Sequence, residues 1–287
     1  IVVTMTWPDL KGLRVSLVYP PYGVTYNEPG IRAVKENYGV FPSLSLLYVA
    51  GVLEACNVKV QFIDANAHCL DKRATIEQLK SFRPQLVGYT LTTYLFHQNI
   101  EWIRDIREAL GVPSLVGGVH VGLFPHESFS HDCLDLGVTG EAEMSLPALL
   151  EAFVAGEEPA HVPGVVFRRD DEVVVTPPAG LVQDVDSVPL PARHLIDNSL
   201  YYSFISRLKN FTPLMTSRGC PFRCIFCEQG GVRFRPRSPG VVVDEIEQAM
   251  VDHGVREFDF FDSAFTINKP RVHEICEEIQ RRGLDFV

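Results

Sequence analysis

The chain has 287 residues and a formal net charge of −10, with 46% hydrophobic and 22% charged residues. Its length fits about two domains of roughly 100–200 residues each. The acidic charge argues against a nucleic-acid partner, because a nucleic-acid-binding surface would be basic. No apolar stretch approaches the ~18 residues that span a bilayer, and no signal-peptide pattern is present. We therefore expect a cytoplasmic protein without a membrane span.

From Arg14 onwards, short β-branched runs alternate with amphipathic stretches. The runs predict strands at 14–19, 59–63, 86–90, 113–116 and 136–139. The amphipathic stretches predict helices at 43–55, 71–82, 96–110 and 144–155. This alternation predicts an α/β fold whose first domain has a parallel, doubly wound, Rossmann-like sheet with right-handed crossovers.

The pattern changes after residue 160. Residues 164–168 and 172–176 flank a polar turn and predict a hairpin. The following segment, 177–194, is rich in proline and aspartate, which is typical of an interdomain linker. The alternation then resumes, with predicted strands at 213–216 and 257–261 and helices at 241–253 and 270–282. We expect a domain at 11–160, a hairpin and linker at 161–205, and the start of a second domain at 206–287.

Three of the seven cysteines, Cys220, Cys224 and Cys227, follow the predicted strand at 213–216. Iron–sulfur clusters are held by cysteine thiolates and usually use four of them, so three would leave one iron open to another molecule. The alternative is a structural zinc site with His194 or His253 as the fourth ligand, although zinc sites more commonly show paired Cys-x2-Cys motifs. We expect the other cysteines to be buried free thiols in a reducing compartment; these are Cys56, Cys69, Cys133 and Cys276.

The Cys-x3-Cys-x2-Cys spacing, with Phe226 directly before the last cysteine, resembles the signature of the radical S-adenosylmethionine (SAM) enzymes. The resemblance implies a 4Fe–4S cluster on the three cysteines, SAM on its fourth iron and Phe226 beside the adenine. It also implies a partial (β/α)6 barrel. Asp262 and Ser263 stand where this family contacts SAM at the end of its second strand, although they could instead form a polar strand end that caps the next helix.

A second set of polar and small residues stands at the ends of the predicted strands of the first domain. Ligands of open α/β sheets bind outside the carboxyl ends of the strands. No Gly-x-Gly-x-x-Gly motif follows the first strand, so a nicotinamide site is weakly supported. The candidate ligand-contacting residues are Thr92, Thr93, Gly117, Gly118, His120, Gly140 and Glu141.

The region from about residue 11 to 200 resembles the cobalamin-binding domain that precedes the core of cobalamin-dependent radical SAM methylases. The resemblance is carried by strand–Pro-Pro, Val-Gly-Gly-Val-His, Thr-Gly-Glu-Ala-Glu and Val-Pro-x-Pro-Ala-Arg, in this order. It implies that the seven candidate residues contact cobalamin. The chain lacks Asp-x-His-x-x-Gly, so we expect no histidine below the cobalt. Each residue also has an ordinary alternative role, such as a hydrogen-bonding loop residue for His120 or a helix cap for Glu141.

Together, the two resemblances imply a cobalamin-dependent radical SAM enzyme with a 4Fe–4S cluster, SAM and cobalamin as cofactors. We expect a methyltransferase that acts on an unactivated carbon of a small molecule through a 5′-deoxyadenosyl radical and methylcobalamin, with an electron donor such as flavodoxin or ferredoxin. No individual catalytic residue is assigned. The alternatives are an oxidative cyclase of the anaerobic tetrapyrrole type and a non-catalytic module that binds cobalamin or zinc.

Two further expectations concern the second domain. The chain opens without methionine and stops at Val287, where a strand is predicted to begin. Only about two βα units of ~30 residues fit after Pro213, so we expect a truncated barrel and an inactive fragment. Arg233, Arg235 and Arg237 form the only dense basic run, which predicts either a solvated loop or a binding site for carboxylates.

Overall fold

The computed structural model describes residues 5–22 and 39–287, which form two compact units. Of these residues, the first unit contains 5–22 and 45–182, and the second contains 39–44 and 183–287. Within the described ranges, no helix is both long and apolar enough to cross a membrane.

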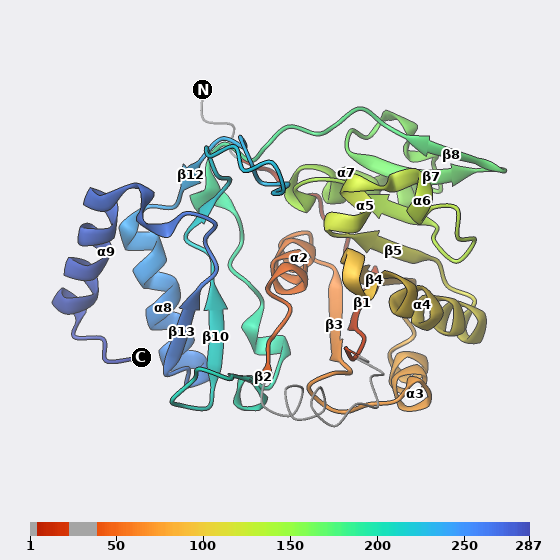
Figure 1. Ribbon diagram of the computed structural model, residues 1–287. Helices are drawn as coiled ribbons and strands as arrows, with labels where there is room; N and C mark the ends of the chain where they lie inside the picture. Colours follow the sequence, from red (N-terminus) through yellow and green to blue (C-terminus); the bar gives the residue numbers. More distant parts are fainter. Residues whose placement is uncertain (1–4, 23–38) are drawn as a thin grey trace. The chain divides into compact units, whose positions relative to one another are not determined.

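The first unit is built on a seven-stranded sheet in the order β3-β1-β4-β5-β6-β7-β8 (Figure 1). The first five strands in this order are parallel, whereas β7 and β8 are antiparallel to their neighbours. The strands are β1 (Arg14–Tyr19), β3 (Lys59–Asp64), β4 (Leu86–Thr90), β5 (Ser114–Gly117), β6 (Leu136–Val138), β7 (Val165–Arg169) and β8 (Glu172–Val175). The predicted hairpin is therefore present, and it extends the sheet as an antiparallel edge.

The helices of this unit are α2 (Leu44–Ala55), α3 (Lys72–Phe82), α4 (Phe96–Leu110), α5 (Val119–Leu123), α6 (Pro125–Ser128) and α7 (Ala142–Ala155). Side chains alternate between the two faces of a strand. Val18, Val87 and Val116 accordingly join one core cluster with Leu79 of α3 and Ile103 of α4. The crossover through α2 runs in the opposite direction to those through α3 and α4, which places α2 on the opposite face. The doubly wound prediction is confirmed.

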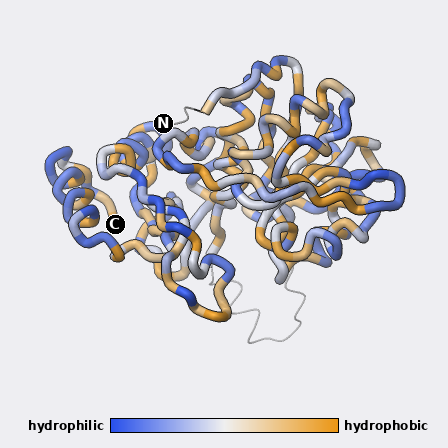
Figure 2. Tube along the Cα trace, turned by 90° about the horizontal axis from the view of Figure 1, so that it is seen from above, coloured by the Kyte–Doolittle hydropathy of each residue, from blue (hydrophilic) through white to orange (hydrophobic). Residues whose placement is uncertain are grey.

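The second unit contains a parallel pair, β10 (Phe211–Leu214) and β13 (Glu257–Phe260), joined by α8 (Pro239–His253) and followed by α9 (Lys269–Arg282). Val287 continues this pattern, because it exchanges backbone hydrogen bonds with Phe258 and Arg256, both 2.9 Å long. Leu214, Ile246 and Ile275 belong to the buried core of the unit. Figure 2 shows α9 as a largely hydrophilic helix, and only Arg271 and Ile275 are buried on it.

Short elements complete the two units, and the sequence pattern did not predict them. Two antiparallel pairs join β2 (Gly39–Val40) to β9 (Tyr202–Ser203) and β11 (Ser217–Arg218) to β12 (Arg235–Pro236). The 3-10 helices are η1 (Thr93–Leu95), η2 (Pro159–His161), η3 (Val185–Ser187), η4 (Arg193–Leu195), η5 (Asn198–Leu200) and η6 (Phe265–Ile267). The prediction that all four non-motif cysteines are buried is wrong, because Cys69 and Cys276 are exposed.

Candidate functional site

The cysteine loop connects β11 to β12, and two residues separate β11 from the end of β10. Its backbone folds into successive turns: the Cys227 N–H donates to the Cys224 carbonyl at 3.1 Å, and the Gly230 N–H donates to the Cys227 carbonyl at 3.1 Å. The Gly231 N–H donates to the Cys220 carbonyl at 3.0 Å, which ties the end of the loop to its first cysteine. A Cβ on Gly230 would lie 3.1 and 3.2 Å from the carbonyls of Cys227 and Cys224. The backbone around the three cysteines is therefore compact.

The three cysteines of the loop differ in exposure. Cys224 and Cys227 are exposed and Cys220 is half-buried. Across 5–22 and 39–287, no three His, Cys, Asp or Glu side chains are arranged closely enough to hold a metal ion. The donor set nevertheless fits an iron–sulfur cluster, since three accessible sulfurs stand on one short loop whose own hydrogen bonds leave all three free to act as ligands.

Gly219 fixes the direction in which the chain enters this loop. Its φ of +78° lies in the left-handed region, and an added Cβ would lie 2.2 Å from the Arg233 carbonyl oxygen. We expect Gly219→Ala to reduce iron incorporation strongly, because the left-handed conformation costs about 1–2 kcal/mol and the clash is with backbone. Iron and acid-labile sulfide analysis after anaerobic reconstitution measures the effect.

Gly231 provides the matched control for this substitution. Its φ is +82°, but an added Cβ would meet only the Arg223 side chain, at 4.0 Å. Gly231→Ala therefore strains the backbone in the same way but creates no clash, and this variant should retain more iron than Gly219→Ala. Equal iron contents in the two variants would contradict the steric argument.

The residues predicted to contact SAM lie on this loop and beyond β13. Phe226 presents an exposed ring, and Ser263 is also exposed. The Asp262 carboxylate accepts from the Thr216 N–H at 3.1 Å and the Thr216 hydroxyl at 2.9 Å, and also from the Ser217 hydroxyl. Asp262 therefore links β13 to the end of β10, and an ionised carboxylate has room for a further donor.

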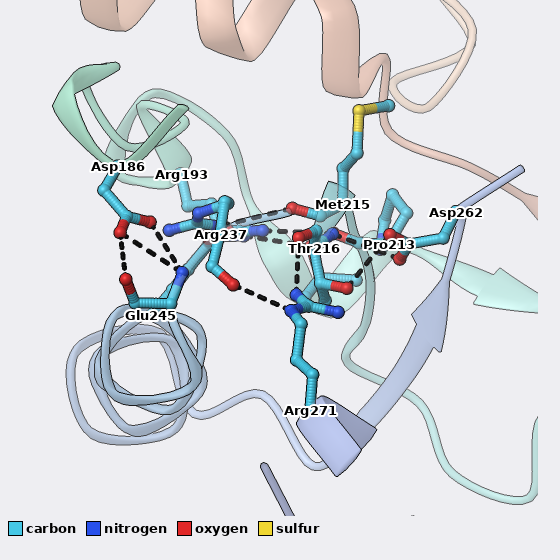
Figure 3. Close-up of polar contacts among 11 residues, drawn as sticks. Asp186, Arg193, Pro213, Met215, Thr216, Arg237, Glu245, Asp262 and Arg271 are labelled. Atoms are coloured by element: carbon cyan, nitrogen blue, oxygen red, sulfur yellow. Dashed lines mark hydrogen bonds and ion pairs between the residues drawn. The ribbon is translucent and has the colours of Figure 1, made fainter. Parts of the chain in front are cut away.

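A buried network of arginines links the end of β10 to α8 (Figure 3). Arg193 and Arg237 each pair with one oxygen of Glu245, the first at 2.7 Å, and all three side chains are at least 96% buried. Arg235 is buried as well, whereas Arg233 is exposed and donates to Gln183. The expectation of a solvated loop is therefore wrong for Arg235 and Arg237, whose hydrocarbon stems and charges are enclosed by the second unit.

This network was not predicted from the sequence, although two signals for it are present there. Glu245 stands among Val242, Val243 and Ile246 on α8, so the apolar face of the helix contains one acidic residue. Arg193 ends the Val-Pro-x-Pro-Ala-Arg motif of the linker, for which no buried contact was predicted. In the structure it donates to the Thr212 hydroxyl at 3.2 Å and the Pro213 carbonyl at 3.0 Å, and so holds this segment against β10.

The candidate cobalamin residues lie at the carboxyl edge of the first sheet. The order of its parallel strands reverses at β1, which makes the crevice outside β1 and β4 the expected ligand site. Thr92 and Thr93 follow β4 and are exposed there. Gly140 follows β6, and a Cβ on it would meet nothing within 4 Å, so this part of the edge is open. The arrangement fits a ligand that lies across the edge.

His120 is buried, and it hydrogen-bonds Thr93, which is exposed at this edge. Its ring is 3% exposed and lies 3.9 Å from the Phe96 ring, centroid to centroid, and its Nδ1 is 3.2 Å from the Thr93 hydroxyl oxygen. Burial lowers the pKa of His120, which favours the neutral imidazole. Its Nε2 is buried without a hydrogen-bond partner among the described residues. His120 therefore orients Thr93.

Two further candidates support the loops that form the edge. Gly118 has a φ of +99°, and an added Cβ would lie 2.7 Å from the Leu91 carbonyl oxygen, whereas neighbouring Gly117 is not crowded in this way. The Glu141 carboxylate accepts from the Val182 N–H at 2.7 Å, although Glu141 makes no side-chain cap to α7. Gly118 thus allows the loop after β5 to pack closely against Leu91, and Glu141 fixes the backbone at Val182. Both contacts support loops beside the expected ligand site.

Comparison with known proteins agrees with both halves of this description. Residues 33–150 match the B12 binding domain family. The chain is 33% identical over 285 residues to an uncharacterized methyltransferase of Pyrococcus horikoshii, which covers 96% of this chain and 59% of the relative. It is 32% identical to the anaerobic magnesium-protoporphyrin IX monomethyl ester cyclase of Cereibacter sphaeroides, over 95% of this chain and 44% of that protein. The chain thus spans about half the length of such relatives.

Solved structures show the same fold. The cobalamin-dependent SAM radical enzyme OxsB aligns with a TM-score of 0.76 at 20% identity, covering 96% of this chain and 38% of OxsB. The radical SAM methyltransferase TsrM from Kitasatospora setae aligns with a TM-score of 0.69 at 23% identity, covering 94% and 51%. The resemblance to the cobalamin-dependent radical SAM enzymes that the motifs indicated is therefore confirmed.

Proposed function

We propose that the full-length protein is a cobalamin-dependent radical SAM methyltransferase that acts on an unactivated carbon of a small molecule. The observation that carries the proposal is the combination of two features in one chain. A loop with three cysteines leaves the first strand of a βαβ unit, and a doubly wound domain that matches the B12 binding domain family precedes it. Catalytic groups of βα barrels stand at the carboxyl ends of strands, where this loop begins.

The residues assigned to the cofactors follow from this arrangement. Cys220, Cys224 and Cys227 would hold the 4Fe–4S cluster, and the exposed ring of Phe226 would lie along the adenine of SAM. Asp262 and Ser263 are proposed to face the SAM amino and carboxylate groups. When bound, the 4Fe–4S cluster would supply the electron for the cleavage of SAM, and cobalamin would supply the chemistry of methyl transfer.

For cobalamin, we propose contacts from the carboxyl edge of the first sheet. Thr92 and Thr93 would offer hydroxyl groups, with His120 holding the Thr93 hydroxyl in place at 3.2 Å. Gly117, Gly118, Gly140 and Glu141 would shape the loops beside the ligand. Because His120 is enclosed beneath Phe96, we propose that it does not coordinate cobalt.

The surroundings of the cysteines support a chemistry that excludes water. Phe222, Ile225 and Phe226 are all exposed apolar side chains beside the three thiols. Covered by SAM or by protein, they would keep solvent from the cluster. We also propose a cytoplasmic location and an electron donor such as flavodoxin or ferredoxin. All seven cysteines are free, which is typical of a reducing compartment.

A second candidate function is oxidative cyclisation or rearrangement without methyl transfer. It is favoured by the 32% identity to a protein named as an anaerobic magnesium-protoporphyrin IX monomethyl ester cyclase. The two functions use the same cofactors and differ in their products. A product that contains one SAM-derived methyl group supports methyl transfer, whereas a product that has lost hydrogen without gaining a methyl group supports cyclisation.

Anaerobic purification tests the proposal. We expect the reconstituted full-length protein to contain about four iron and four acid-labile sulfide atoms per chain, and to bind cobalamin in a stable complex. Addition of a strong one-electron reductant and SAM should release 5′-deoxyadenosine and methionine, measured by chromatography. Zinc without sulfide, or the absence of SAM cleavage in the reduced holoprotein, would contradict the enzyme proposal and favour a non-catalytic module.

A further inference from the structure

Thr216 hydrogen-bonds both Asp262, which follows β13, and Arg271 of α9 (Figure 3). It also stands at the start of the segment that leads into the cysteine loop. Thr216 is fully buried and lies two positions after Leu214, the last residue of β10. Its N–H and hydroxyl both donate to Asp262. Its carbonyl accepts from the Arg237 N–H at 2.9 Å and from Arg271 Nη2 at 2.6 Å. Every polar group of Thr216 is therefore used to hold the end of β10.

Arg271 reaches this point from the first turn of α9. Its side chain is 5% exposed, and its Nε donates to the Arg237 carbonyl at 2.8 Å. Burial lowers the pKa of Arg271, which reflects the cost of enclosing the charge. The planar guanidinium presents several donors in a rigid fork, so it can bond two carbonyls at once.

The two carbonyls belong to opposite limbs of the cysteine loop. Thr216 and Ser217 lie on the limb that leads to Cys220, and Arg237 ends the limb that returns from Cys227. Between them, β11 and β12 pair Ser217 with Pro236 and Arg218 with Arg235. Arg271 thus bridges both limbs at the base of the loop, on the side of the paired strands away from the cysteines.

We propose that Arg271 is a positioning residue that closes the base of the cysteine loop, and that Asp262 acts with it through Thr216. The inference rests on the proposed function, since the loop is taken to carry the cluster on which SAM binds. Without the bridge, the loop can still hold its cysteines and Thr216 can still bond Asp262. The returning limb, however, keeps its hydrogen bonds to the first limb but loses its bond to Arg271, so it is held less firmly relative to Asp262. Cluster assembly should survive, whereas SAM should bind the cluster less well.

The test compares Arg271→Gln and Arg271→Lys in the reconstituted full-length protein. Lysine keeps the charge but offers a single ammonium group, which cannot reproduce the fork. We expect both variants to assemble the cluster and to raise the KM for SAM in reductive cleavage by about tenfold or more, as expected for the loss of hydrogen bonds from a charged donor. The change that SAM produces in the electron paramagnetic resonance spectrum of the reduced cluster should also be altered.

Arg282→Gln is the control on the same helix, because Arg282 pairs with Glu278, Asp244 and Glu247 away from the loop. It should leave both readouts at wild-type values. If Arg271→Gln and Arg271→Lys lower only the melting temperature and leave the SAM KM and the spectrum unchanged, Arg271 is merely structural and the inference is wrong. If Arg271→Lys keeps wild-type values while Arg271→Gln does not, the positive charge rather than the two-carbonyl bridge is responsible, and the inference is also wrong. A wild-type protein that binds no iron would instead overturn the proposed function.

Discussion

Replacing Cys224 by alanine is expected to remove iron and acid-labile sulfide from the reconstituted protein and to abolish SAM cleavage. Two remaining thiolates cannot hold a cluster that already lacks a fourth protein ligand. Because Cys224 is exposed, the substitution creates no cavity, and the variant should unfold at the same temperature as the cluster-free wild type. Iron, sulfide and 5′-deoxyadenosine are measured on the same anaerobic sample. Cys220→Ala and Cys227→Ala should behave in the same way.

Cys276→Ala is the matched control, since Cys276 is an exposed thiol on α9 outside the motif. It should keep wild-type iron, sulfide and SAM cleavage. A Cys224→Ala protein that retains its full cluster and its cleavage activity would disprove the assignment of the three cysteines, and would require a different metal site.

The second large effect concerns stability rather than chemistry. Glu245→Gln keeps the shape of the side chain but leaves Arg193 and Arg237 buried without the carboxylate that both of them pair with. Removing one partner of a buried ion pair costs about 3–5 kcal/mol, because the remaining charge stays desolvated. We expect the second unit to unfold at a much lower urea concentration, as followed by circular dichroism.

Glu247→Gln tests whether burial is the cause. Glu247 lies two residues further along α8 and pairs with Arg282 at 2.7 Å, but its side chain is 45% exposed. Exposed pairs contribute about 0–1 kcal/mol, so this variant should unfold close to wild type. Equal destabilisation by the two substitutions would show that loss of negative charge on α8, rather than loss of the buried pair, governs stability.

The sequence alone determined most of the secondary structure, and its cysteine spacing alone led to the proposed cluster ligands. Period-two and period-3.6 patterns are local, so β1, β4 and α4 were predicted with the bounds that the structure shows. The spacing of Cys220, Cys224 and Cys227 is also local, because a short loop needs no tertiary information to offer three thiols to one cluster. Neither kind of pattern predicts which side chains that lie far apart in the sequence will contact each other.

The tertiary structure decided which polar groups are buried and what they contact. Arg237 stands in a run that the sequence pattern could equally assign to solvent, and only the packing of α8 brings Glu245 to it. The sequence predicts only that His120 stands at the end of a strand, whereas its packing against Phe96 and its hydrogen bond with Thr93 depend on the fold. Arg271 and Thr216 are 55 positions apart, and they meet because β10 and β13 pair in parallel and α9 returns beside them. Contacts of this kind depend on the assembled fold, since the desolvation of a charge is set by everything that surrounds it.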